Sequence, residues 1–252
     1  NEGILKNRER ELQQAKQLIE LQRQKSEELL LNILPKAVAD ELKINGATQP
    51  LHYDSVTVIF TDFKGFTKIS EQMSPEELVG ELDIFFTSFD ELADKFKLEK
   101  LKTIGDAYMC AGGLPTVNNT HPVDACLFSL QVQFLMQETK RVKSVKGLPF
   151  WELRLGIHTG PVVAGVIGKK KFAYDVWGDA VNTAARMESS GEPGKINIAG
   201  RTYELVKDFF DFEYRGKIEA KNKGKIDMYF LQSIKKPLAA DETLRNPNDK
   251  FW

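Results

Sequence analysis

Hydrophobic positions divide the chain into a polar N-terminal segment and a longer region of alternating strand and helix patterns. Residues 1–34 contain no proline and are dominated by Glu, Gln, Lys, Arg and Leu, the composition of a long exposed helix. Leu5, Leu12 and Ile19 recur every seven residues, but polar residues interrupt the seam. The pattern predicts a weak parallel coiled coil, with a single solvated helix as the alternative.

From Ser55 the spacing changes to that of strands and amphipathic helices. A β-branched run predicts a largely buried strand that ends at Asp62. Ser74, followed by proline and two acids, predicts a helix start, and this helix continues to about Phe96. The remaining patterns predict two strands over residues 98–112, a helix over Val123–Lys143, a strand pair at Leu153–Ile157 and Val162–Ile167, a helix over Asp179–Ser189, and short strands at Ile196–Ile198, Phe210–Tyr214 and Met228–Leu231. The order β-α-β-β-α-β with extra strands predicts an α+β fold with a ferredoxin-like core.

Proline, glycine and composition changes predict four parts of the chain. The helical segment 1–34 is followed by a linker, 35–50, that begins at a proline and contains an Asn-Gly turn. Residues 51–233 form the globular domain. Residues 234–252 are rich in Pro, Asn and charged residues, and they predict a loose tail.

Charge and hydropathy exclude several classes of protein. The 252 residues suffice for one or two domains, and 35 Lys and Arg against 36 Asp and Glu leave a net charge of −1. That balance argues against a nucleic-acid-binding protein. No apolar run approaches the roughly 18 residues of a spanning helix, so we expect no membrane contact by this fragment. The chain starts at Asn1 with no secretory signal behind it, and we expect it to be part of a longer protein.

Two cysteines and three histidines leave little for a structural zinc site. We expect Cys110 and Cys126 to be reduced thiols in a reducing compartment, because a chain of this size needs no disulfide. A single disulfide between them is the alternative.

Two aspartates stand where predicted strands end. Asp62 precedes Phe63-Lys-Gly65-Phe-Thr67, in which the glycine permits a tight turn whose backbone N–H groups can face a phosphate. Asp106 lies in the turn between the two strands of residues 98–112. Carboxylates brought together at strand ends are suited to hard divalent cations. Each aspartate taken alone also fits a simple turn residue.

Asn182 and Arg186 lie four residues apart, on one face of the predicted helix. An amide and a guanidinium in this arrangement can stabilise charge on a ribose oxygen and a phosphate in a transition state. A surface helix that happens to carry an arginine is the alternative.

Together these motifs resemble the class III nucleotidyl cyclase catalytic domain, over roughly Ser55 to Leu231. The motifs that carry the resemblance are Phe60-Thr-Asp-Phe-Lys-Gly-Phe-Thr67, Lys102-Thr-Ile-Gly-Asp-Ala-Tyr108, Leu153-Arg-Leu-Gly-Ile-His-Thr-Gly-Pro161 and the run from Asp175 to Met187. The segment Leu29–Gly46 also resembles the transducer helix that couples family members to upstream sensors.

The resemblance implies a set of metal and phosphate ligands. Asp62 and Asp106 would bind two Mg²⁺ or Mn²⁺ ions, with the Phe63 carbonyl as a further ligand. Arg154 and Lys221 would hold the triphosphate, and Asn222 stands where the family usually has glycine, which leaves Lys223 as an alternative to Lys221. The substrate would also contact the turn residues Gly65, Phe66 and Thr67.

The resemblance also implies the chemistry. Asn182 would orient the ribose and Arg186 would stabilise the pentavalent phosphorus. In the family, one metal lowers the pKa of the 3′-hydroxyl, its oxygen attacks the α-phosphorus in line, and pyrophosphate leaves on the other metal. No protein base is required.

Lys102 and Asp175 fall where the family's purine-selecting residues lie. A lysine donates to N1 of adenine and an aspartate accepts from the 6-amino group, so we predict ATP as substrate and an adenylate cyclase that forms cyclic AMP. A guanylate cyclase is the first alternative, and a non-catalytic nucleotide-binding dimerisation module is the second.

In the family, metal binding and base recognition at one site come from different chains of a head-to-tail dimer. This sequence carries both sets, which implies a homodimer with two composite active sites. The N-terminal helix would then regulate the dimer in response to an upstream sensor domain. We expect a cytoplasmic location, with any membrane attachment of the parent chain upstream of Asn1.

Overall fold

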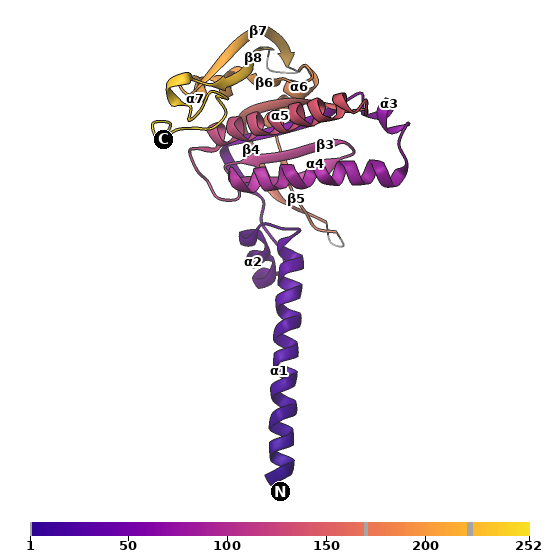
Figure 1. Cartoon of the computed structure of the whole chain (residues 1–252). Helices are drawn as coiled ribbons and strands as arrows, with labels where there is room; N and C mark the ends of the chain where they lie inside the picture. Colours follow the sequence, from indigo (N-terminus) through magenta and orange to yellow (C-terminus); the bar gives the residue numbers. More distant parts are fainter. Residues whose placement is uncertain (1, 169–170, 221–223) are drawn as a thin grey trace. The chain divides into compact units, whose positions relative to one another are not determined.

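A computed structural model describes residues 2–168, 171–220 and 224–252 (Figure 1). The chain divides into two compact units: one holds the two N-terminal helices with the segment Gly165–Tyr174, and the other begins at Leu51. The helices are α1 Glu2–Leu31, α2 Lys36–Asn45, α3 Phe66–Ser70, α4 Pro75–Lys95, α5 His121–Val145, α6 Asp179–Ser189 and α7 Gly200–Val206. The strands are β1 Leu51–Lys64, β2 Leu98–Ile104, β3 Ala107–Gly112, β4 Glu152–Ile167, β5 Ala173–Trp177, β6 Ile196–Ala199, β7 Phe210–Ala220 and β8 Gly224–Ile234, and a 3₁₀ turn spans Lys236–Leu238.

The predicted N-terminal helix is confirmed as the uninterrupted helix α1 (Figure 1). The expected Asn-Gly turn is also present, because α2 ends at Gly46 in the left-handed conformation, with φ of 69°. An ion pair of 2.8 Å joins Glu27 of α1 to Lys43 of α2. The apolar side chains that recur every seven residues in α1 are exposed, Leu5 by 61%, Leu12 by 58% and Ile19 by 64%.

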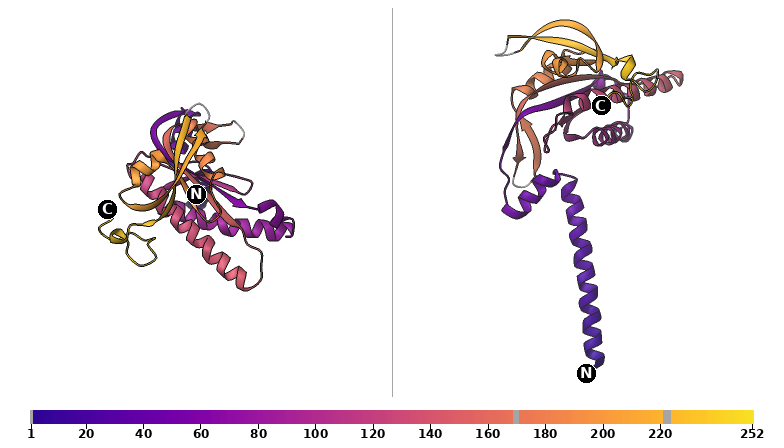
Figure 2. Two further views of the ribbon diagram at one scale, coloured as in Figure 1. Left: turned by 90° about the horizontal axis from the view of Figure 1, so that it is seen from above. Right: turned by 90° about the vertical axis from the view of Figure 1, so that its left-hand side faces the viewer.

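The ferredoxin-like core is confirmed. Strands run in the order β2-β3-β1-β4-β6-β8-β7, and β5 pairs with β4 outside this path. The first four positions are those of a βαββαβ unit, with all neighbours antiparallel. Strand β6 joins β4 in parallel, and the long β7–β8 hairpin extends the sheet beyond it (Figure 2).

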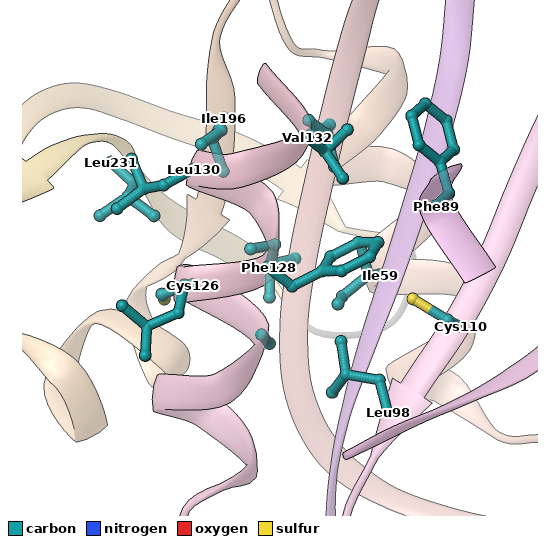
Figure 3. Packing of buried hydrophobic residues seen from close by; sticks show 14 of the residues in the cluster. Ile59, Phe89, Leu98, Cys110, Cys126, Phe128, Leu130, Val132, Ile196 and Leu231 are labelled. Carbon is teal, nitrogen blue, oxygen red and sulfur yellow. The ribbon is translucent and has the colours of Figure 1, made fainter. Parts of the chain in front are cut away.

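Helices α4 and α5 pack together on one face of the sheet (Figure 1). Helix α4 starts where the sequence predicts, since Ser74 and Glu77 form a reciprocal capping box with hydrogen bonds of 3.2 and 2.8 Å. Between helices and sheet lies a continuous core that includes Phe128 of α5 and Ile59 of β1 (Figure 3). Apolar burial of this kind is the main stabilising contribution to the fold.

Helix α6 covers the opposite face. Leu155 and Ile157 of β4 belong to the core under α5, so the residue between them, Gly156, faces the other way. A Cβ atom at Gly156 would lie 1.9 Å from the backbone nitrogen of Glu188, and one at Gly160 would lie 2.9 Å from Ala180. The two glycines therefore let α6 approach the backbone of β4.

The predicted strand pair around Pro161 is wrong, because β4 runs through this proline as one strand. Proline has no N–H to donate to a neighbour. The register of β1 shifts at this point. Tyr53 pairs with Val162 and Val56 pairs with Gly160, so two residues of β1 lie opposite the proline. The bulge accommodates the missing donor, and β1 begins at Leu51 rather than at Ser55.

The expectation of a loose C-terminal tail is also wrong. Phe251 is 2% exposed and packs against Phe209 and Phe210. The backbone N–H of Ile234 donates to the carbonyl of Leu244 at 2.8 Å. The tail is polar in composition, but one buried aromatic ring and backbone hydrogen bonds hold it on the domain.

Strand β5 and the short helices α3 and α7 are among the elements that were not predicted, and the five and seven residues of these helices are too few for a clear helical period. Cys110 and Cys126 are both buried and are not joined by a disulfide, as predicted.

Candidate active site

Two carboxylates meet at the end of β1 and in the β2–β3 turn. Asp62 lies two residues before the end of β1, and Asp106 follows β2 immediately after Gly105. Burial and the neighbouring carboxylate of Asp62 raise the pKa of Asp106, while backbone N–H groups of Asp106 itself and of Phe63 oppose the rise. The antiparallel pairing of β1 with β3 brings these two side chains together, as predicted from the sequence.

An aromatic cluster anchors the turn after Asp62. The ring of Phe63 is 2% exposed and lies 5.5 Å from the ring centroid of Phe85 and 5.2 Å from that of Trp151. Gly65 has φ of 72°, a conformation that glycine adopts without strain. Phe66 packs against Trp151 at 5.2 Å, and Thr67 is exposed on α3. The backbone at this turn is therefore fixed by side chains that point away from it.

Arg154 lies directly opposite Asp62 in the β1–β4 register. Its Nη2 donates to Oδ2 of Asp62 at 2.6 Å, and its Nε lies 2.9 Å from Oε1 of Glu188 in the last turn of α6. All three side chains are largely buried, with exposures of 19% for Arg154, 28% for Asp62 and 13% for Glu188. The guanidinium thus stands between two carboxylates.

Glu188 is a site residue that the sequence did not reveal. Burial raises its pKa to about 7, Arg154 opposes the rise, and Asp62 and Asp106 add to it. The residue belongs to the same helix as Asn182 and Arg186, but nothing in its spacing indicates that it faces β4. The sequence feature that could have indicated this contact is Gly156. Because it has no side chain, the end of α6 that carries Glu188 can pack against β4.

The residues present fit divalent cations. Two carboxylates and a backbone carbonyl at Phe63 are hard oxygen donors of the kind that Mg²⁺ and Mn²⁺ prefer. Across the described ranges, three or more His, Cys, Asp or Glu side chains do not gather in a group that could hold a metal ion. The contact with Arg154 already neutralises Asp62, which is the electrostatic role that a cation would take over.

Lys102 and Asp175 form a second group. Lys102 Nζ donates to Asp175 Oδ2 at 2.5 Å, and these residues lie 73 positions apart in sequence. The other oxygen of Asp175 accepts from the backbone N–H of Val176 at 2.9 Å. The aspartate is 16% exposed and the lysine 40%, so the carboxylate is held in place while the ammonium reaches it from β2.

Asn182 and Arg186 extend from α6 as predicted. Asn182 is exposed, and Arg186 Nη1 donates to the backbone carbonyl of Glu219 in β7 at 2.6 Å. The expected triphosphate ligand Lys221 lies outside the described residues, as do Asn222 and Lys223.

The structure therefore assembles two sets of side chains. Asp62, Asp106, Arg154 and Glu188 form one, and Lys102 with Asp175 forms the other. Within residues 2–168, 171–220 and 224–252, no hydrogen bond or ion pair joins the two sets.

Comparison with known proteins identifies the class. The family model described as the adenylate and guanylate cyclase catalytic domain matches residues 48–233. The chain therefore belongs to this family, the class III cyclases, which are lyases. Cyclase domains of this class generally use divalent metal ions.

Relatives of both substrate types match the chain. It is 39% identical over 238 residues to an adenylate cyclase of Mycobacterium tuberculosis, covering 92% of this chain and 51% of the relative. It is 38% identical over 234 residues to human guanylyl cyclase C, covering 91% of this chain and 22% of the relative. The chain thus spans about half or less of these proteins.

A solved structure resembles this chain in both fold and sequence. The catalytic core of a rhodopsin-guanylyl cyclase with converted specificity, in complex with ATPαS, superposes with a TM-score of 0.67 at 34% identity. The match covers 73% of this chain and 98% of the other.

In the present chain, no described helix combines the length and apolar character needed to cross a membrane.

Proposed function

We propose that this cyclase domain converts ATP to 3′,5′-cyclic AMP and pyrophosphate. The observation that carries the proposal is the contact between Lys102 and Asp175. An ammonium donor matches the N1 acceptor of adenine, and a carboxylate acceptor matches its 6-amino group. Guanine presents the reverse pattern, and each mismatched buried group costs about 1–3 kcal/mol.

Guanylate cyclase activity is the second candidate, because relatives of both kinds match the chain. The choice between them rests on the base-reading pair. We therefore expect the protein, assayed with Mn²⁺, to turn over ATP at least about tenfold faster than GTP, the ratio that one mismatched group would produce.

The double variant Lys102→Glu, Asp175→Cys tests this assignment. A carboxylate in place of the ammonium accepts from N1 of guanine, so the variant should lose the ATP preference while cyclase turnover with GTP appears or rises. The exposed ion pair on α7 offers a matched control, and Lys207→Glu with Glu204→Cys should leave the ATP to GTP ratio unchanged. A wild-type preference for GTP, or an unchanged ratio in the Lys102 and Asp175 variant, would contradict the proposal.

In the proposed site, Asp62, Asp106 and the Phe63 carbonyl hold two divalent cations. The cations supply Lewis acidity, which lowers the pKa of the ribose 3′-hydroxyl and offsets phosphate charge. The 3′-hydroxyl loses its proton to solvent, its oxygen forms a bond to the α-phosphorus, and the bond from that phosphorus to pyrophosphate breaks. No side chain is assigned as the base.

The remaining residues orient the substrate and stabilise charge. Arg154 and Lys221 bind the triphosphate, and backbone N–H groups at Gly65, Phe66 and Thr67 face its phosphates. Asn182 orients the ribose. Arg186 donates to phosphoryl oxygens as charge develops in the transition state.

We further propose a head-to-tail homodimer with two composite sites. Each site takes Asp62, Asp106 and Arg154 from one chain, and Lys102, Asp175, Asn182 and Arg186 from the other. Support comes from the absence of any bond between the two sets in the described part of one chain. Helix α1, whose apolar positions are exposed, would pair with its copy and transmit signals from an upstream sensor domain.

The division of the chain follows from these roles: residues 1–34 as signalling helix, 35–50 as transducer, 51–233 as catalytic domain and 234–252 as C-terminal segment. A cytoplasmic location remains our expectation, since neither of the two cysteines is in a disulfide.

A further inference from the structure

Glu188 occupies a costly position for a carboxylate. Its side chain is 13% exposed in the last turn of α6, and its Oε1 lies 2.9 Å from Nε of Arg154. A buried ion pair contributes little to stability compared with apolar residues of similar volume. A carboxylate kept at such a place, against an arginine proposed to bind phosphate, calls for a role beyond packing.

Two nitrogen atoms of the Arg154 guanidinium each contact a carboxylate. Nε contacts Glu188, and Nη2 contacts Asp62. A guanidinium is planar and carries five N–H donors in a fixed arrangement, so holding Nε fixes the direction of both Nη groups. The contacts with Asp62 and Glu188 are made by different nitrogen atoms, Nη2 and Nε respectively.

The contacts of Arg154 with Asp62 and with Glu188 would respond differently to the binding of a metal ion and a triphosphate. If Asp62 held a cation, its carboxylate would no longer be available to Nη2 of Arg154, and Nη2 could then donate to an anion. Glu188 is not among the proposed metal ligands, so its contact with Nε persists. The same arginine would pass from Asp62 to the triphosphate without losing its orientation.

We propose that Glu188 is a positioning residue that holds Arg154 in the direction required to bind the triphosphate and the leaving pyrophosphate. The inference rests on the phosphate-binding role of Arg154 in the proposed function. It does not depend on which purine the substrate carries.

The test separates pyrophosphate binding from binding of the cyclic product. The full chain with Mn²⁺ is titrated with inorganic pyrophosphate and with cyclic AMP by calorimetry. Glu188→Ala should weaken pyrophosphate binding by about tenfold, the usual effect of removing a supporting contact, and leave cyclic AMP binding unchanged. Glu188→Gln keeps the size of the side chain but removes the charge of the ion pair, so it should also weaken pyrophosphate binding and leave cyclic AMP binding unchanged. Glu192→Ala removes an exposed glutamate just beyond α6 and should change neither affinity.

A double-mutant cycle tests whether Glu188 acts through Arg154. In an Arg154→Ala background, Glu188→Ala should cause no further loss of pyrophosphate affinity. An equal loss for both ligands, an additive effect in the cycle, or wild-type pyrophosphate affinity in Glu188→Ala would overturn the proposal.

Failure of the wider function gives a different pattern. If Arg154→Ala binds pyrophosphate as the wild type does, both the phosphate role of Arg154 and the positioning role of Glu188 are wrong. If the cycle behaves as expected but GTP is the preferred substrate, the adenylate assignment alone is wrong. If Glu188→Ala does not fold, Glu188→Gln carries the test. It should weaken pyrophosphate binding and leave cyclic AMP binding unchanged, and a parallel loss of affinity for both ligands, or wild-type affinity for pyrophosphate, would overturn the proposal.

Discussion

At the scale of single residues, the site is arranged around the balance of charge at the end of β1. The carboxylates of Asp62 and Glu188 both contact the guanidinium of Arg154, and Asp106 adds a third carboxyl group beside Asp62. Burial and the neighbouring carboxylate of Asp62 raise the pKa of Asp106, because two like charges lie close together in a partly buried place. Divalent cations would relieve this repulsion, which explains how the site can favour metal without a third acidic ligand.

Asp106→Ala should reduce cyclase turnover by at least about a thousandfold, because the second metal-binding carboxylate is lost. The substitution also removes a carboxylate that raises the pKa of Glu188, so the folded domain should keep its stability. Turnover with Mn²⁺ and thermal unfolding measure the two effects. Retained cyclisation would refute the two-metal assignment.

Mixing experiments supply the control for this variant. Asp106→Ala and Arg186→Ala remove groups assigned to opposite halves of the composite site, and each should be inactive alone. Mixed dimers contain one site with neither defect, so activity should return to about a quarter of the wild-type value when subunits combine at random. Recovery of nothing, with both variants folded and dimeric, would count against composite sites.

At the scale of elements, helix α6 would serve both composite sites, since Asn182 and Arg186 are assigned to one of them and Glu188 contacts Arg154 of the other. It carries Asn182, Arg186 and Glu188, and it lies against β4 at Gly156. A short helix at such close range is possible only where the strand presents no side chain. The glycine of the Leu-Gly-Ile-His motif is therefore a packing requirement rather than a flexible point.

Gly156→Ala should lower the free energy of unfolding by about 1–3 kcal/mol or more, because its Cβ would lie 1.9 Å from the backbone nitrogen of Glu188. Helix α6 must then move away from β4, and cyclase turnover should fall sharply. Urea denaturation and turnover measure both effects. Gly80→Ala in α4 is the matched control, since nothing lies within 4 Å of its Cβ position, and it should be neutral or stabilising by up to about 1 kcal/mol. Equal behaviour of the two variants would show that α6 does not depend on this contact.

At the scale of the whole molecule, the exposed heptad positions of α1 bear on regulation. A helix with this many exposed apolar and charged side chains gains little from its own chain, since marginal helices in water depend on packing. Pairing with a second copy would cover Leu5, Leu12 and Ile19. The N-terminal helix would then increase the population of the dimer that holds the active sites.

Deletion of residues 1–28 should weaken dimerisation and shift the concentration dependence of cyclase activity to higher protein concentrations. Specific activity should recover when the truncated protein is concentrated, because the catalytic domain keeps all of its site residues. Analytical ultracentrifugation and turnover as a function of concentration provide the measurements. Unchanged dimerisation together with unchanged activity would exclude a role for the helix.

Much of the fold follows from local sequence signals. The helix caps at Ser74 and Gly46, the turn between β2 and β3, and the alternation of strand residues all act over a few positions. Where long-range pairing decides, the sequence alone misled: Pro161 continues a strand because β1 bulges opposite it, and Phe251 holds a tail of polar composition.

The sequence by itself determined the class of protein and the types of side chain available, because the motifs around Asp62, Asp106 and Arg186 combine residue type with fixed spacing. Only the tertiary structure decided which of them meet. Lys102 and Asp175 lie 73 residues apart, and Glu188 reaches Arg154 only because Gly156 has no side chain. Such contacts depend on the register of the sheet and on the distance between a helix and a strand. No short stretch of sequence specifies either of them.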